Sequence, residues 1–185
     1  LRLTDGLHYF LVTLVTDGDM ETSGVTNWTA TTATLSKETA AANVMFGAQS
    51  MRVLFNGGVP RAQSATFNVV PSSTLFVSAW VRVAVGTAKL VLWDVTNGEE
   101  IDSATSTQRQ WMQVNVGNGA VTIPSTCKQV AVRLEGVGAT DDAYWDDVCV
   151  LTHLRRTYDL SSWLIHGGQI QDVCYLPQGQ SGPET

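Results

Sequence analysis

The chain has 185 residues, of which 44% are hydrophobic, so it is long enough to bury the core of one domain and too apolar for global disorder. Its net charge of −6 and the lack of a basic block argue against a nucleic-acid-binding surface, and no apolar run approaches the ~18 residues of a membrane span. Only 15% of the residues are charged, against about 25% in an average soluble domain, and this shortage indicates a surface that lies against other protein subunits.

In chain order, short β-branched runs alternate with turns rich in Gly, Asn, Pro and Ser. Val and Thr together account for 45 residues, a composition typical of β-sheets. The predicted strands lie at about 7–15, 28–35, 50–55, 64–70, 75–85, 88–95, 110–116, 129–135 and 144–151. A short helical turn is expected only at 36–43. The predicted fold class is therefore all-β, a jelly-roll β-sandwich of about eight or nine antiparallel strands.

The domain organisation follows from changes of composition toward both ends of the chain. Residues 1–14 are predicted to form an N-terminal extension with a strand, and residues 15–151 the jelly roll. Residues 152–185 are predicted to form a C-terminal extension that docks to neighbouring subunits, and their last nine residues have the polar composition of a linker.

Side-chain alternation assigns the two faces of the predicted strands. In the run 75–85 the odd-numbered residues are apolar and are predicted to face the core, whereas Trp80 and Arg82 fall on the other face. In the run 129–135 the same alternation places Arg133 and Glu135 away from the core. A face that mixes aromatic and charged residues suits a partly wet binding surface.

Three stretches resemble the carbohydrate-binding modules of the family 4/9 type, and the resemblance covers about residues 15–151. They are residues 15–21 (VTDGDME) followed by Trp28, residues 47–53 (GAQSMRV), and residues 144–148 (YWDDV). Trp111 lies where the family has a tryptophan that opens a late strand. The resemblance implies a β jelly roll, a domain type also similar to modules in phage and other virion proteins.

The resemblance also implies a structural calcium ion near the chain ends of the jelly roll. Glu21 and Asp146 match the side-chain ligands of the family, and carbonyl groups near Asp19 and Gln49 would complete a shell of six to eight oxygens. Asp147 is the alternate ligand, because residues 146 and 147 face opposite sides of a strand. The competing interpretation is that these carboxylates only accept hydrogen bonds from turns.

Sugar binding would combine an aromatic ring, stacked on a pyranose, with polar groups that bind its hydroxyls. The candidate ligand-binding residues are Trp80, Arg82, Trp93, Gln113 and Arg133. Packing is the competing interpretation for both tryptophans. Three other tryptophans, Trp28, Trp111 and Trp145, fall at family positions that look structural.

No catalytic motif accompanies these residues, so the chain is predicted not to be an enzyme. A glycosidase needs two carboxylates across a cleft. The adjacent acids Glu99–Glu100 and Asp141–Asp142 fall in predicted turns and are interpreted as solvated surface. The nucleophile elbow of serine hydrolases is also missing from the sequence.

Together these observations predict a non-catalytic structural or binding protein, a module-like jelly roll within a larger assembly such as a virion decoration, capsid or tail component. The alternative is a glycan-binding module of a secreted or cell-surface protein. The expected partners are other protein subunits, in a homo- or hetero-oligomer, and polysaccharide or surface glycan. The expected location is a virion, or the extracellular space or cell surface.

Overall fold

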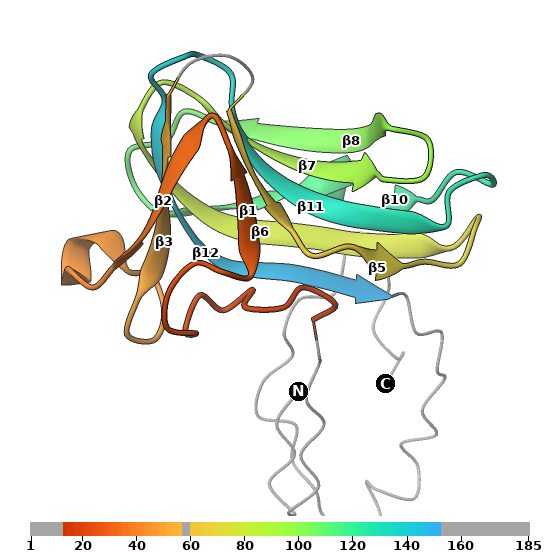
Figure 1. Cartoon of the computed structure of the whole chain (residues 1–185), viewed down its shortest axis with the longest axis horizontal. Helices are drawn as coiled ribbons and strands as arrows, with labels where there is room; N and C mark the ends of the chain where they lie inside the picture. The colour runs from red at the N-terminus through yellow and green to blue at the C-terminus, as the bar shows by residue number, and fades with distance from the viewer. Residues whose placement is uncertain (1–12, 57–59, 153–185) are drawn as a thin grey trace, which may run out of the picture. The chain divides into compact units, whose positions relative to one another are not determined.

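The computed structural model describes residues 13–56 and 60–152, which lie in one compact unit (Figure 1). Almost all of the two predicted extensions, 1–14 and 152–185, falls outside these residues. Of the strand predicted at 7–15, only residues 13–15 are described, and they do not form a strand. Within the described ranges, no helix is long and apolar enough to cross a membrane.

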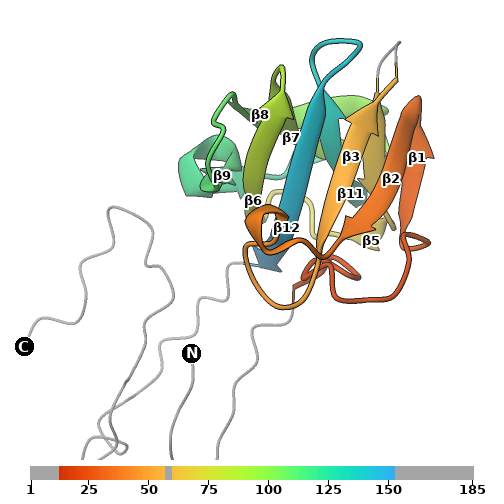
Figure 2. The ribbon, with the colours of Figure 1, turned by 90° about the vertical axis from the view of Figure 1, so that its left-hand side faces the viewer.

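Two six-stranded antiparallel sheets form a β-sandwich, which confirms the predicted fold class (Figures 1 and 2). The described residues form twelve strands rather than eight or nine, because the runs predicted at 28–35 and 64–70 are each divided into two strands, and the strands Glu99–Ser106 and Val121–Thr122 were not predicted. The first sheet has the order β1-β4-β11-β7-β8, and β5 also pairs with β11. Its strands are β1 (Trp28–Thr31), β4 (Arg61–Ser64), β5 (Phe67–Asn68), β7 (Ala88–Asp94), β8 (Glu99–Ser106) and β11 (Gln129–Gly136).

The second sheet has the order β10-β6-β12-β3-β2, and β9 also pairs with β6. Its strands are β2 (Ala33–Glu38), β3 (Ser50–Phe55), β6 (Thr74–Val85), β9 (Met112–Asn115), β10 (Val121–Thr122) and β12 (Asp142–Thr152). The helical turn predicted at 36–43 is shorter than expected, because β2 runs through Glu38 and only a 3-10 helix, Ala41–Asn43, follows. A second short 3-10 segment, Val116–Gly119, follows β9.

The core lies between the sheets and is built from alternate strand residues. In β6 the odd-numbered residues from Leu75 to Val83 are buried, as their alternation predicts. Val85 was expected in the same row, but it is 48% exposed because it ends the strand. Trp28 and Trp145 are core residues, which confirms their structural interpretation, and Trp111 is half-buried.

Strand β8 was not predicted, and Glu99–Glu100 therefore lie in a strand rather than in a turn. The segment Glu99–Ser106 is rich in polar residues and lacks the apolar alternation of a core strand. It pairs only with β7, at the edge of its sheet, so its strand conformation depends on a partner supplied by the tertiary fold.

Each sheet also has an outer face, formed by the residues that alternate with the core row. The first outer face belongs to the first sheet and comprises Arg61, Gln63, Lys89, Val91, Trp93, Glu100, Ala131, Arg133 and Glu135. The second outer face belongs to the second sheet and comprises Arg52, Trp80, Arg82, Gln113, Asp142, Tyr144 and Asp146.

Candidate functional site

The five predicted ligand-binding residues do not form one site, because the sandwich divides them between its two outer faces. Trp80, Arg82 and Gln113 lie on the second outer face, where Trp80 pairs in register with Gln113. Trp93 and Arg133 lie on the first outer face. The two groups are separated by the core, so each face has to be judged by its own contacts.

On the second outer face, the connection between β2 and β3 contacts Trp80 and Arg82. Figure 2 shows the ribbon of this connection in front of β6 and β12. An amino nitrogen of Arg82 donates to Oδ1 of Asn43 at 2.6 Å. The ring of Phe46 meets Trp80 edge to face, with centroids 5.6 Å apart and an interplanar angle of 84°. These two predicted ligand-binding residues therefore hold a segment of the chain itself.

The rest of the second outer face is also paired internally. Arg52 donates two hydrogen bonds to Asp142, at 2.9 and 2.7 Å, and these bonds hold the pKa of Arg52 above its usual value. The ring of Tyr144 lies 5.8 Å from the guanidinium carbon of Arg52 and 5.1 Å from that of Arg82.

The prediction that Asp141–Asp142 form solvated surface is wrong: both are buried, and Asp141 accepts two backbone N–H groups.

On the first outer face, Arg133 lies flat against Trp93. Its guanidinium carbon is 3.4 Å from the ring centroid, and its Nε donates to Oε1 of Gln63 at 2.7 Å. Strand β7 supplies Trp93, β11 supplies Arg133 and β4 supplies Gln63, so the sheet register brings the three together. Arg133 covers one side of the ring, and Trp93 as a whole is half-buried.

Glu135, two residues along β11 from Arg133, completes the centre of this face. Its nearest charged partner is Arg133, with 3.9 Å between Oε1 of the glutamate and an amino nitrogen of the arginine. That separation exceeds hydrogen-bonding distance, and no other described residue donates a hydrogen bond to Glu135. Burial raises the pKa of Glu135, and the charge of Glu100 adds to this effect, while Lys89, Arg133 and Arg61 oppose it.

The middle of the first outer face is sheltered although it points away from the core. Val91 and Ala131 are fully buried there, and Arg133 and Glu135 are only 7% and 8% exposed. At the edge of the face, Lys89 forms an ion pair with Glu100. The face therefore offers enclosed charged groups with open hydrogen-bonding capacity, which is an arrangement suited to binding a polar ligand.

The sequence pattern pointed to Trp93 and Arg133, and the alternation of β11 placed Glu135 on the same face as Arg133 without marking it as a ligand-binding residue. Gln63 and Arg61 were missed as their neighbours. Gln63 and Arg61 had no such signal, because β4 pairs with β11 across about 70 residues of sequence.

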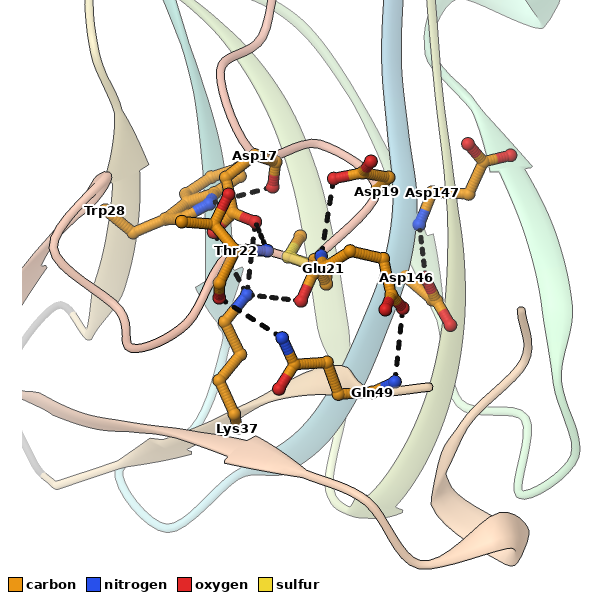
Figure 3. Close-up of polar contacts among 10 residues, drawn as sticks. Asp17, Asp19, Glu21, Thr22, Trp28, Lys37, Gln49, Asp146 and Asp147 are labelled. Carbon is orange, nitrogen blue, oxygen red and sulfur yellow. Dashed lines mark hydrogen bonds and ion pairs between the residues drawn. The ribbon is translucent and has the colours of Figure 1, made fainter. Parts of the chain in front are cut away.

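The residues predicted as calcium ligands gather where the loop before β1 meets the β2–β3 connection and β12 (Figure 3). Oε1 of Glu21 accepts the backbone N–H groups of Ala48, at 2.9 Å, and Gln49, at 3.1 Å. Oδ1 of Asp19 accepts the N–H of Glu21.

Asp146 is fully buried and is satisfied in the same way. Its Oδ2 accepts the backbone N–H groups of Met45 and Phe46, each at 3.0 Å, and its Oδ1 accepts that of Asp147. Burial raises the pKa of Asp146, and these three N–H groups counteract the rise. Asp147, the alternate ligand, is exposed in a β-bulge with φ 45°, so Asp146 is the buried member of the pair.

A lysine supplies the cation of this region. Nζ of Lys37 donates to both carboxylate oxygens of Asp17 and, at 2.6 Å, to the carbonyl of Met20, and the side chain of Asp17 is fully buried (Figure 3). Within residues 13–56 and 60–152, no group of three or more His, Cys, Asp or Glu side chains is placed to hold a metal. The described residues thus do not present the six to eight free oxygens of a calcium shell, and calcium stays a prediction from the resemblance.

No protein-family model and no curated protein matches the chain. Solved structures do match its fold. The structure titled "Family 16 Carbohydrate Binding Module-2" aligns with a TM-score of 0.57 and 16% identity, over 75% of this chain and 99% of that one. The structure titled "CBM4 structure and function" aligns with a TM-score of 0.58 and 12% identity, again over 75% and 99%.

A third structure, the enzymatically active domain of tailspike protein 4 from bacteriophage CBA120, aligns with a TM-score of 0.55 and 13% identity, over 76% of this chain and 21% of that one. At these identities the likeness shows the fold, which is that of carbohydrate-binding modules. The resemblance found in the sequence is confirmed at this level, and the matched structures extend beyond the family 4/9 type.

Proposed function

We propose that the chain is a non-catalytic carbohydrate-binding module whose glycan site is the first outer face. One observation carries the proposal: Arg133, stacked on Trp93, and Glu135 are enclosed at the centre of an outward face and keep unused hydrogen-bonding capacity. Charged and amide side chains of this kind bind sugar hydroxyls, and the exposed part of the half-buried Trp93 ring offers an apolar surface for a pyranose. The alignment with nearly the whole length of two separate carbohydrate-binding modules supports a binding role without catalysis.

Affinity electrophoresis against a panel of soluble polysaccharides tests this site. We expect at least one polysaccharide to retard the protein, and Arg133→Met to weaken that binding about tenfold or more, because it removes hydrogen bonds from a charged donor. Arg82→Met and Trp80→Ala on the second outer face are the matched controls and should leave the affinity unchanged. Failure to bind any polysaccharide, or equal losses from changes on both faces, would falsify the proposal.

A second candidate function is a structural role in a larger assembly, such as a virion decoration, capsid or tail component. The likeness to a phage tailspike protein and the low content of charged residues favour it. This role predicts that the full chain associates with itself or with other subunits. Sedimentation that shows a monomer over a wide range of protein concentration, and no co-purifying subunit, would count against it.

A further inference from the structure

The first outer face has more positive than negative charge, although the whole chain has a net charge of −6. Its cations are Arg61, Lys89 and Arg133, and its anions are Glu100 and Glu135. The ion pair of Lys89 and Glu100 is complete in itself. The centre of the face is thus left with two guanidinium groups and one carboxylate.

Arg133 is the more deeply buried of these two arginines. Its Nε is occupied by Gln63, but among the described residues neither amino nitrogen has a hydrogen-bond acceptor. Both nitrogens keep contact with water. Among the described residues, the fully buried side-chain N and O atoms that lack a hydrogen-bond partner are the indole nitrogens of Trp111 and Trp145, and no nitrogen of Arg133 is among them. A guanidinium group has five N–H donors in a planar fork, so a nearly buried Arg133 presents unused donors toward the surface.

Electrostatics favour an added negative charge at this place. Burial and, to a smaller extent, the neighbouring charge of Arg61 together lower the pKa of Arg133 to about 10, although Glu135 opposes both effects. A cation destabilised by burial and by a second cation gains most from an anion that also accepts its hydrogen bonds.

We propose that the glycan bound on this face is acidic, and that a sugar carboxylate accepts the hydrogen bonds of the Arg133 amino nitrogens beside Arg61. This inference rests on the proposed glycan site and names the class of its ligand. A carboxylate matches the planar fork of a guanidinium group in shape and charge. Trp93 and Gln63 already hold that group in place, so little side-chain entropy is lost when the carboxylate binds.

Matched pairs of glycans test the inference: oligomers of galacturonate, glucuronate or mannuronate, each against its carboxyl-reduced form, which keeps the sugar backbone and loses the charge. By isothermal titration at low salt, we expect at least one acidic oligomer to bind ten or more times tighter than its reduced partner. Arg133→Met should abolish this ratio, and Arg133→Lys should keep only part of it, because lysine retains the charge without the fork. Arg82→Met on the second outer face should leave the ratio unchanged.

The outcomes separate this inference from the proposed function. If neutral glycans bind at the first outer face and no acidic member is preferred, the acidic class is wrong and the glycan site stands. If no glycan of either kind binds, both are wrong. Equal binding of polyglutamate, or a preference confined to sulfated neutral galactans, would also overturn the inference, since the first indicates unspecific attraction and the second a different anion.

Discussion

Both outer faces carry a tryptophan beside an arginine, yet the chain uses the two pairs differently. On the second outer face, Phe46 packs on Trp80 and Asn43 accepts a hydrogen bond from Arg82, because the β2–β3 connection folds back over them. On the first outer face no described segment does this, and Arg133 stacks on Trp93 itself. The same residue types are thus part of the structure where the chain covers them, and available to a ligand where it does not.

The largest effect is expected away from both outer faces, at the buried ion pair of Lys37 and Asp17. Lys37→Met should lower the free energy of unfolding by about 3–5 kcal/mol, because it leaves the fully buried Asp17 carboxylate without its cation. Urea denaturation measures this, with Lys128→Met, at an exposed lysine, as the control. A loss below about 1 kcal/mol would show that Lys37 does not hold the loop before β1 in place.

The tryptophans should separate stability from binding. Trp80→Ala should lower the free energy of unfolding by about 2 kcal/mol and leave glycan affinity unchanged, since this half-buried ring packs against Phe46. Trp93→Ala should weaken glycan binding, because Arg133 loses the ring on which it rests. Denaturation and titration of both variants check this. Loss of glycan affinity in Trp80→Ala, with none in Trp93→Ala, would place the glycan site on the second outer face instead.

The arginines should show the same contrast with a smaller effect. Arg52→Met should lower the free energy of unfolding by about 2 kcal/mol, because Asp142 loses two charged hydrogen bonds. Arg133→Met should change it by less than about 1 kcal/mol, since a buried cation with no hydrogen-bonded carboxylate contributes little. If both variants lose the same free energy of unfolding, Arg133 is a structural residue.

A still smaller effect concerns pH. Because burial raises the pKa of Glu135 in the folded chain, its carboxyl group binds a proton more readily there than in the unfolded chain. Its contribution to stability is complete below its ordinary pKa of 4.5 and is lost as the pH rises through the higher folded value. Across this pH range, the melting temperature of the unaltered protein should therefore fall more steeply with rising pH than that of Glu135→Gln. Parallel curves of melting temperature against pH would contradict the raised pKa of Glu135.

The smallest effect concerns calcium, whose ligand set stays a prediction from the resemblance. Nζ of Lys37 and the backbone N–H groups of Met45 and Phe46 already occupy oxygens of this region, so we expect the melting temperature to be the same in calcium and in a chelator. A rise of several degrees in calcium, abolished by Asp146→Asn, would instead support the ligand set implied by the sequence resemblance.

Local pattern was enough to predict most of the strands and the side on which each residue lies. The alternation of β6 placed Trp80 away from the core, and that of β11 placed Arg133 likewise. Motifs spread along residues 15–148 indicated the module fold. Strand β8 was missed because its polar sequence becomes a strand only beside β7.

The sequence by itself therefore determined an all-β chain, its strand faces and its resemblance to carbohydrate-binding modules. Only the tertiary structure decided that Trp80 and Trp93 lie in different sheets, that the β2–β3 connection covers one of them, and that Gln63 meets Arg133. The physical reason is that alternation is a property of neighbours along the chain, whereas sheet membership depends on pairing between segments far apart in sequence, which no local pattern records.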